Sequence, residues 1–343
     1  MFVPPPFHER RPGLVAPVRH DPDGLRGPTP GVARGPRWRT TSRGLFVPHD
    51  VPATSFQRTV EAAAVLTTDE AVTGWAALAW TGGRWFDGTI DGATPRDVHV
   101  VARRHIASQA GWRVSQEFLH PDEIVVVDGL PVTTHVRSVT YEMRYAAALG
   151  DAVVALDMAC YSDLVSIAEV TTYLSALGPV TGIQQARDAL VEADENSWSP
   201  RETRMRGVWT KRALLPRPLC NVPVFDGSGR HVGTPDLISP EMGLVGLYNG
   251  SDHLSLVGAA ADEKKSSDYR DVGLEVVTML ATDWSRLSDF IARLHAGARR
   301  ARPLGGSWTV DPPAWWTPTH TVARRRALTD LERHRYLRYR GAA

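Results

Sequence analysis

The chain has 343 residues, of which 43% are hydrophobic and 22% charged, and its formal net charge is +1. This balance is typical of a globular protein with two or three domains and excludes a strongly basic field over the whole molecule. The chain has no run of about 18 apolar residues, so we expect no membrane span. The prolines near the start disfavour the apolar core of a signal peptide. Cys160 and Cys220 lie in apolar surroundings without a zinc pattern, which favours buried thiols in a reducing cytoplasm.

Residues 1–36 are rich in proline and glycine and lack periodicity, which predicts an extended or disordered arm. Basic residues then surround an aromatic side chain, Trp38. A basic arm beside an aromatic can grip a phosphate backbone, so the arginines at this point are candidate DNA contacts. They are Arg37, Arg39 and Arg43. An arm packed on the first domain, with its arginines in solvent, explains the same pattern.

The sequence pattern of residues 37–195 predicts an α+β region. Residues 55–66 and 69–80 have helical spacing and a tight connection, which indicates a helix-turn-helix arrangement. The second helix lacks the exposed arginines and asparagines of a recognition helix, so we expect it to pack in the core. The neighbouring tryptophans are expected to be buried for the same reason: Trp75, Trp80 and Trp85.

Strands and then helices are expected in the remainder of this region. Asp128-Gly129 separates two β-rich runs and predicts a hairpin turn. Residues 135–195 are helical in pattern, and we interpret them as a bridge to the second half of the chain.

Residues 196–302 follow the order helix, three strands, helix, strand, helix, which suits an α/β core. Ser199, Pro200 and Glu202 fit the N-cap, N1 and N3 positions of the first helix, with Glu202 as the partner of a capping box. Asp283 is expected to cap the last helix of this region. The residues Asp226 to Gly229 predict a further hairpin turn.

Acidic and imidazole side chains gather where two of these strands end. Asp236 follows a proline at one strand, the next strand ends at Tyr248, and His253 stands just beyond it. An acid and a histidine at adjoining strand ends can hold a divalent metal and position water for phosphodiester attack. A solvated or hydrogen-bonded acid at a strand end explains Asp236 equally.

The stretch from Gly233 to His253, GTPDLISPEMGLVGLYNGSDH, is followed by YRDVGLEVV and resembles proteins akin to very-short-patch-repair endonucleases. Those proteins have the PD-(D/E)xK layout. In actinobacteria the module often follows a region similar to AbiEi-type antitoxins, which residues 69–80 match. The resemblance covers the chain from about Trp38 onward. It implies a restriction-endonuclease-like three-layer α/β domain at residues 196–302, bound Mg²⁺, DNA as a partner, and a function in phage defence or toxin–antitoxin regulation with a cognate toxin protein.

The chain departs from this family at the metal ligands. Relatives read E-Y-D-G where this chain has Leu247-Tyr248-Asn249-Gly250. Leucine cannot bind Mg²⁺, and asparagine is a weaker oxygen donor than aspartate. Asp236, His253 and Glu202 remain as candidate catalytic residues, Glu202 because relatives have a glutamate on the same helix facing the active centre. Asp236 and Asn249 remain as weak candidate ligands of Mg²⁺.

We therefore expect a cytoplasmic, DNA-associated protein with an impaired nuclease site. An active Mg²⁺-dependent endonuclease and a scaffold that does not touch DNA are the alternatives. Residues 303–343 form a basic tail whose last segment has the pattern of a helix. We expect weak, salt-sensitive, sequence-independent DNA binding. Its candidate contacts are the basic arm, Lys265, Arg324, Arg325 and Arg326. Docking of the tail helix through Leu328, Leu331 and Leu337, with its arginines in solvent, explains the same pattern and is compatible with DNA contact.

Overall fold

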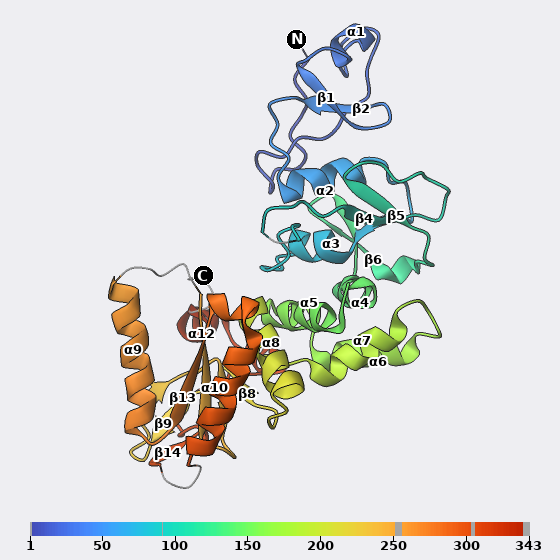
Figure 1. Cartoon of the computed structure of the whole chain (residues 1–343). Helices are drawn as coiled ribbons and strands as arrows, with labels where there is room; N and C mark the ends of the chain where they lie inside the picture. Colours follow the sequence, from blue (N-terminus) through green and yellow to red (C-terminus); the bar gives the residue numbers. More distant parts are fainter. Residues whose placement is uncertain (1, 91, 251–255, 303–305, 339–343) are drawn as a thin grey trace. The chain divides into compact units, whose positions relative to one another are not determined.

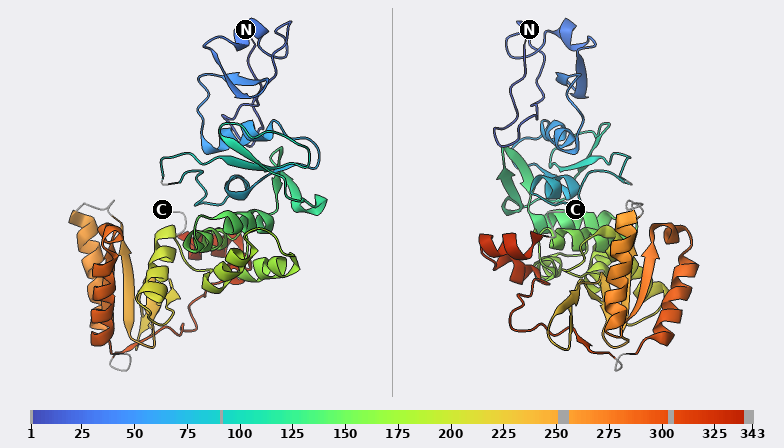
Figure 2. Two further views of the ribbon diagram at one scale, coloured as in Figure 1. Left: turned by 45° about the vertical axis from the view of Figure 1, so that its right-hand side comes forward. Right: turned by 90° about the vertical axis from the view of Figure 1, so that its left-hand side faces the viewer.

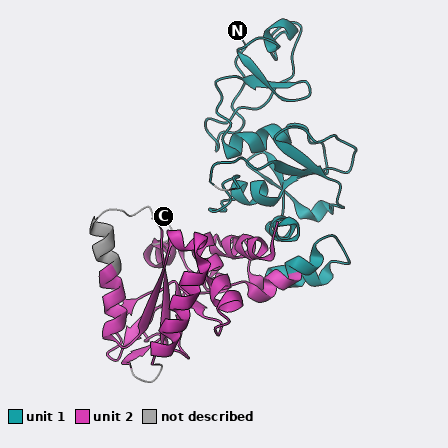
Figure 3. Ribbon diagram, in the orientation of Figure 1, with its two compact units in different colours: residues 1–146, 169–186 teal, residues 147–168, 187–343 magenta. Residues whose placement is uncertain are grey.

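The computed structural model describes residues 2–90, 92–250, 256–302 and 306–338, with side chains in residues 256–271 only from Glu263 onward. The chain divides into two compact units (Figures 1 and 3). Unit 1 comprises residues 1–146 and 169–186, and unit 2 comprises residues 147–168 and 187–343. The division differs from the predicted boundary at residue 195, because α6 (Ile167–Ala176) and α7 (Ile183–Glu192) each contribute residues to both units. Within the described ranges, no helix is both long and apolar enough to cross a membrane.

Unit 1 is built on a mixed five-stranded sheet with the order β5-β4-β3-β7-β6. Its strands are β3 (Ala71–Thr73), β4 (Val98–Val101), β5 (Trp112–Ser115), β6 (Ile124–Val127) and β7 (Leu130–Thr133). Its main helices are α2 (Ser55–Ala63), α3 (Gly74–Trp80) and α4 (His135–Tyr145), with a 3₁₀ turn at Pro121–Glu123. The predicted hairpin between β6 and β7 is confirmed. Asp128 and Gly129 both have positive φ, as a two-residue turn of this twist requires.

The predicted helix over residues 69–80 is wrong in its first half. Residues 71–73 form β3, which pairs with β4 on one side and β7 on the other. Gly74 then turns the chain into α3 with φ +65°, and a Cβ atom there would lie 2.5 Å from the Glu142 carboxylate. The expected helix-turn-helix is therefore also wrong, because a strand separates the two helices.

The expected packing role of α3 is confirmed, since all its residues are buried. Trp75 and Trp80 are fully buried, whereas Trp85 is 36% exposed, so its assignment to the core was wrong. Trp85 lies in a loop after α3, outside any helix or strand that could carry it inward.

The proline-rich start of the chain is held by specific contacts. It leads through α1 (Pro30–Ala33) into an antiparallel pair, β1 (Trp38–Ser42) and β2 (Leu45–Pro48). Arg11 donates to the backbone carbonyl of Trp80 and forms an ion pair with Asp128 at 2.8 Å. Gln57 exchanges two hydrogen bonds with the backbone of Val15. The described part of this segment is thus ordered by side chains of unit 1. It turns back on itself at an antiparallel bridge between Pro6 and Val15, so the prediction of an extended or disordered arm is wrong for these residues.

Unit 2 contains a four-stranded sheet with the order β13-β12-β11-β8. These strands are β8 (Leu219–Cys220), β11 (Leu237–Ser239), β12 (Leu244–Asn249) and β13 (Glu275–Leu280). β12 runs parallel to β13, and β11 is antiparallel to both β12 and β8. A smaller sheet joins β9 (Val224–Asp226), β10 (His231–Gly233) and β14 (Trp308–Thr309), with the predicted hairpin turn between β9 and β10.

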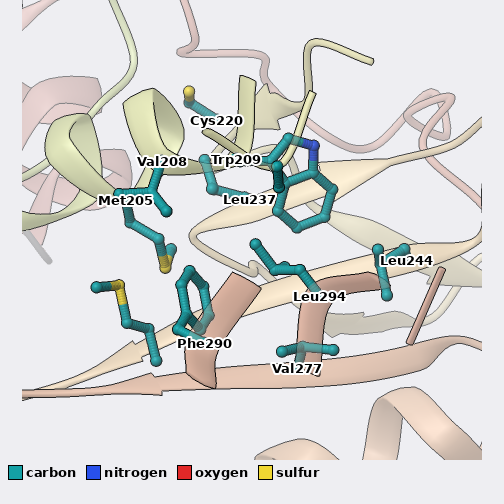
Figure 4. Close-up of a cluster of buried hydrophobic side chains, with 11 residues drawn as sticks. Met205, Val208, Trp209, Cys220, Leu237, Leu244, Val277, Phe290 and Leu294 are labelled. Carbon is teal, nitrogen blue, oxygen red and sulfur yellow. The ribbon is translucent and has the colours of Figure 1, made fainter. Parts of the chain in front are cut away.

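Helices cover both faces of the four-stranded sheet. They are α8 (Pro200–Gly207), continued by a π-helical turn at Val208–Arg212, α9 (Leu256–Asp271) and α10 (Leu287–Arg300). On one face Trp209, Phe290 and Leu294 pack on Leu244 (Figure 4). On the other face Tyr269 of α9 packs in a second core with strand residues of the sheet. α9 and α10 accordingly flank β13 on opposite sides (Figures 1 and 2). These layers confirm the predicted mixed α and β class.

Two predicted helix boundaries in unit 2 are wrong. Asp283 does not cap α10, which begins at Leu287. It lies in the 3₁₀ turn Ala281–Ser285, and its carboxylate accepts the N–H of Leu280 at 2.7 Å. The tail forms two short helices, α11 (Val322–Arg326) and α12 (Asp330–Tyr336), rather than one, because Thr329 starts a new helix with its own capping box. α5 (Leu149–Tyr161) completes unit 2.

Candidate functional site

The register of β11 and β12 brings Asp236 and the end of β12 to one edge of the sheet, as the sequence predicted. Leu237 pairs with Gly246 and Ile238 with Val245. Continuing this register by one residue beyond β11 places Asp236 across from Leu247. The Asp236 carboxylate accepts the backbone N–H of Tyr248 at 2.6 Å. Since side chains alternate along a strand, Asp236 and Leu247 belong to the same face.

Glu202 reaches this edge from the first turn of α8. The Ser199 hydroxyl accepts the N–H of Glu202 at 3.2 Å, which is the predicted N-cap bond. The Glu202 carboxylate accepts the Ser199 hydroxyl at 2.8 Å, the Trp198 backbone N–H at 2.9 Å and the Asn221 side-chain amide at 2.7 Å. In a standard capping box the glutamate would instead accept the N–H of the N-cap residue itself. The Glu202 carboxylate therefore accepts the backbone N–H of Trp198, one residue before the predicted donor, Ser199.

The carboxylate of Asp236 shifts the pKa values of two neighbouring side chains at this edge, Glu202 and Tyr269. Burial raises the pKa of Glu202, and the negative charge of Asp236 raises it further, to about 7. Burial and the same aspartate raise the pKa of the Tyr269 hydroxyl. Asp236, Glu202 and Tyr269 thus converge, although they come from the start of β11, from α8 and from α9.

Two polar atoms beside these acids lack a hydrogen-bond partner among the described residues. They are Oδ1 of Asn221 and the hydroxyl oxygen of Tyr269, and both residues are almost fully buried. Buried polar atoms normally have a partner, so the pair marks this edge as an incompletely satisfied polar site. The sequence analysis missed both residues. Asn221 has a left-handed backbone conformation, with φ +48°. No sequence motif predicts this conformation or the position of its side chain.

The described side chains do not fit a Mg²⁺ site. No cluster of three Asp, Glu, His or Cys side chains that could hold a metal occurs in this part of the chain. Leu247 is 6% exposed and packs in the core with Tyr269, at the position opposite Asp236. Mg²⁺ needs near-octahedral oxygen ligands, whereas both acids here already accept N–H or O–H donors. Asn249 lies at the end of β12, on the face of Leu247 by alternation, and His253 lies outside the described residues.

The prediction that Arg325 contacts DNA is wrong. It is fully buried, and its guanidinium forms an ion pair with Asp163 at 2.6 Å. It also donates to the backbone carbonyls of Cys160 and Glu195. These bonds use the guanidinium inside unit 2, so it is closed to a phosphate.

The other candidate DNA contacts differ in exposure. Arg37, Arg43 and Arg324 are exposed, and Lys265 is half-buried on α9. Arg39 is half-buried and forms an ion pair with Glu61, and Arg326 donates to the backbone carbonyls of Asp163 and Leu164. Arg37, Arg39 and Arg43 belong to unit 1, whereas Lys265, Arg324 and Arg326 belong to unit 2.

The tail is docked on unit 2, and of the three leucines expected to hold it Leu328 and Leu337 are half-buried, whereas Leu331 is exposed. Leu331 is 79% exposed, whereas Val322 is fully buried. The backbone N–H of Val322 donates to the Glu195 carboxylate at 2.6 Å, and Arg333 forms an ion pair with Asp163 at 3.0 Å. Buried charge and backbone bonds therefore fix the tail.

No protein-family model matches this chain, and no curated protein or solved structure matches it either.

Proposed function

We propose that this protein associates with DNA through a nuclease-like unit 2 whose active site does not cut. The observation that carries the proposal is the buried Leu247 at the position that the register of β11 and β12, continued by one residue, places across from Asp236. Cleavage of a phosphodiester by a metal-dependent nuclease requires carboxylates that hold the ion and orient the attacking water. An apolar side chain at the place opposite Asp236 removes a ligand that such a site needs.

The contacts of Glu202 support the proposal that the active site does not cut. Its carboxylate accepts three donors that tie the start of α8 together, including Ser199 and Asn221. Burial and the charge of Asp236 raise the pKa of this group and so favour its protonated form. A protonated, helix-capping glutamate is a poor ligand for a hard cation. The function in phage defence or toxin–antitoxin regulation, with a cognate toxin as partner in the cytoplasm, belongs to this proposal and rests on the resemblance of residues 233–253 and 69–80.

The test measures cutting and binding on the same protein. We expect no nicking of supercoiled plasmid in Mg²⁺ or Mn²⁺. We also expect binding of duplex DNA that weakens as salt rises, because phosphate contacts release counterions. The failure of the wild-type chain to bind duplex even at low salt would overturn the proposal and favour a scaffold that does not touch DNA.

A second function, that of an active endonuclease, is favoured by one observation, the convergence of Glu202 and Asp236. Metal-dependent nicking that disappears in Asp236→Ala would establish it. Nicking that persists in Asp236→Ala would instead identify a contaminating nuclease.

A further inference from the structure

An exposed arginine stands next to the acidic edge and is held by an aromatic ring. Arg201 lies in the first turn of α8, directly before Glu202, and its guanidinium carbon is 5.6 Å from the ring centroid of Trp284. It forms no hydrogen bond or ion pair with any residue that the structure describes. Its neighbours on α8 are already paired, Arg204 with Asp151 and Arg206 with the buried Asp157.

Trp284 is itself fixed in place. It is partly buried against the core that contains Phe290, and its indole N–H donates to the Tyr248 hydroxyl at 3.3 Å. The backbone N–H of Tyr248 in turn holds the carboxylate of Asp236. A continuous series of contacts therefore runs from Arg201 through Trp284 and Tyr248 to Asp236.

We propose that Arg201 binds a backbone phosphate of DNA beside Asp236 and Glu202, and that Trp284 is its positioning residue. The proposal rests on the proposed association with DNA and names the side chain that performs it at this edge. The negative charge of Asp236, and of Glu202 when it is ionised, repels a phosphate, so DNA can approach this edge only if a cation offsets that charge. Arg201 supplies that charge from the residue adjacent to Glu202.

The stacked geometry suits phosphate recognition. A guanidinium carries its five N–H donors in its own plane, and its flat face can rest on an aromatic ring while the donors remain available. A phosphate then accepts two parallel N–H bonds from the fork. Holding the side chain on Trp284 also reduces the conformational entropy that Arg201 loses when it binds.

The test compares single-arginine variants of the full chain by the dependence of duplex affinity on salt. We expect Arg201→Ala to weaken binding and to lower the slope of log K against log salt by about 0.9, the value for one phosphate contact on duplex DNA. Arg299→Ala is the matched control, because Arg299 is exposed near the end of α10 and has no partner in the described structure. It removes the same charge and should leave the slope unchanged.

Two further variants separate charge from positioning. Arg201→Lys keeps the charge but not the planar fork, so we expect the slope to be retained while affinity falls. Trp284→Ala should weaken binding, whereas Trp284→Phe keeps an aromatic face and should restore most of it. If Arg201→Ala behaves as Arg299→Ala does while the wild type binds, the role of Arg201 is overturned and the proposed function stands. If the wild type does not bind, the proposed function fails as well.

Discussion

The backbone N–H of Tyr248 donates to the carboxylate of Asp236 at 2.6 Å, across the gap between the end of β12 and the start of β11. This bond holds Asp236 against the end of β12. The register of the two strands, continued by one residue, places Leu247 opposite Asp236. Directly opposed side chains on one face of an antiparallel pair have Cβ atoms about 4.5–5.5 Å apart. A carboxylate at position 247 would therefore be within reach of a cation held by Asp236.

Replacing Leu247 by Glu together with Asn249 by Asp should rebuild a metal site. In chelator the variant should be less stable than wild type, because a carboxylate replaces a leucine in the core. Mn²⁺ should restore its melting temperature, and calorimetry should show binding that wild type lacks. Val245→Glu is the control, since Val245 is fully buried on the same face but lies across from Ile238 rather than Asp236. Equal rescue of both variants by Mn²⁺ would contradict the geometry.

Glu202→Gln should flatten the dependence of stability on pH. The folded-state pKa of Glu202, about 7, lies above its ordinary value of 4.5, so the folded chain binds this proton more tightly than the unfolded chain. This group therefore makes the protein less stable as the pH rises from about 4.5 to about 7. The variant should lose that decline in urea unfolding, while Glu241→Gln, on the exposed turn before β12, should keep it. An unchanged slope in Glu202→Gln would show that burial and Asp236 do not act on this group.

Ser199 and Glu202 should behave as one cap. Each alanine substitution removes part of the same set of hydrogen bonds at the start of α8. We expect each to cost about 0.5–2 kcal/mol of unfolding free energy. The double variant should cost less than the sum, because either change already breaks the shared bond. Strict additivity in denaturant unfolding would show that the two side chains stabilise the helix independently.

Arg325→Ala should destabilise the protein far more than Arg324→Ala. Loss of Arg325 leaves Asp163 short of one partner in a buried site, and such losses cost about 3–5 kcal/mol. Arg324 is exposed, so its removal should change stability by no more than about 0.5 kcal/mol. Chemical denaturation measures both. Similar effects of the two substitutions would mean that the buried ion pair does not hold the tail.

The sequence by itself determined the features that neighbouring residues create. The hairpin turn at Asp128-Gly129 and the N-cap of Ser199 at α8 were predicted from a few consecutive residues. Their hydrogen bonds close within the same few residues, so no distant partner is needed. The approach of Asp236 to the end of β12 was also predictable, because one short turn connects the two strands.

Only the tertiary structure decided what distant residues create. β3 has three residues and exists because β4 and β7 pair with it, so local helical spacing misled the prediction for residues 69–80. The sequence alone does not distinguish Arg325 from the arginines beside it, because its ion-pair partner, Asp163, lies 162 positions earlier. Arg201 and Trp284 meet for the same reason, through the packing of α8 and the turn before α10 on one core. A side chain's exposure and its partners depend on the whole fold, whereas a cap or a turn depends on its neighbours in the chain.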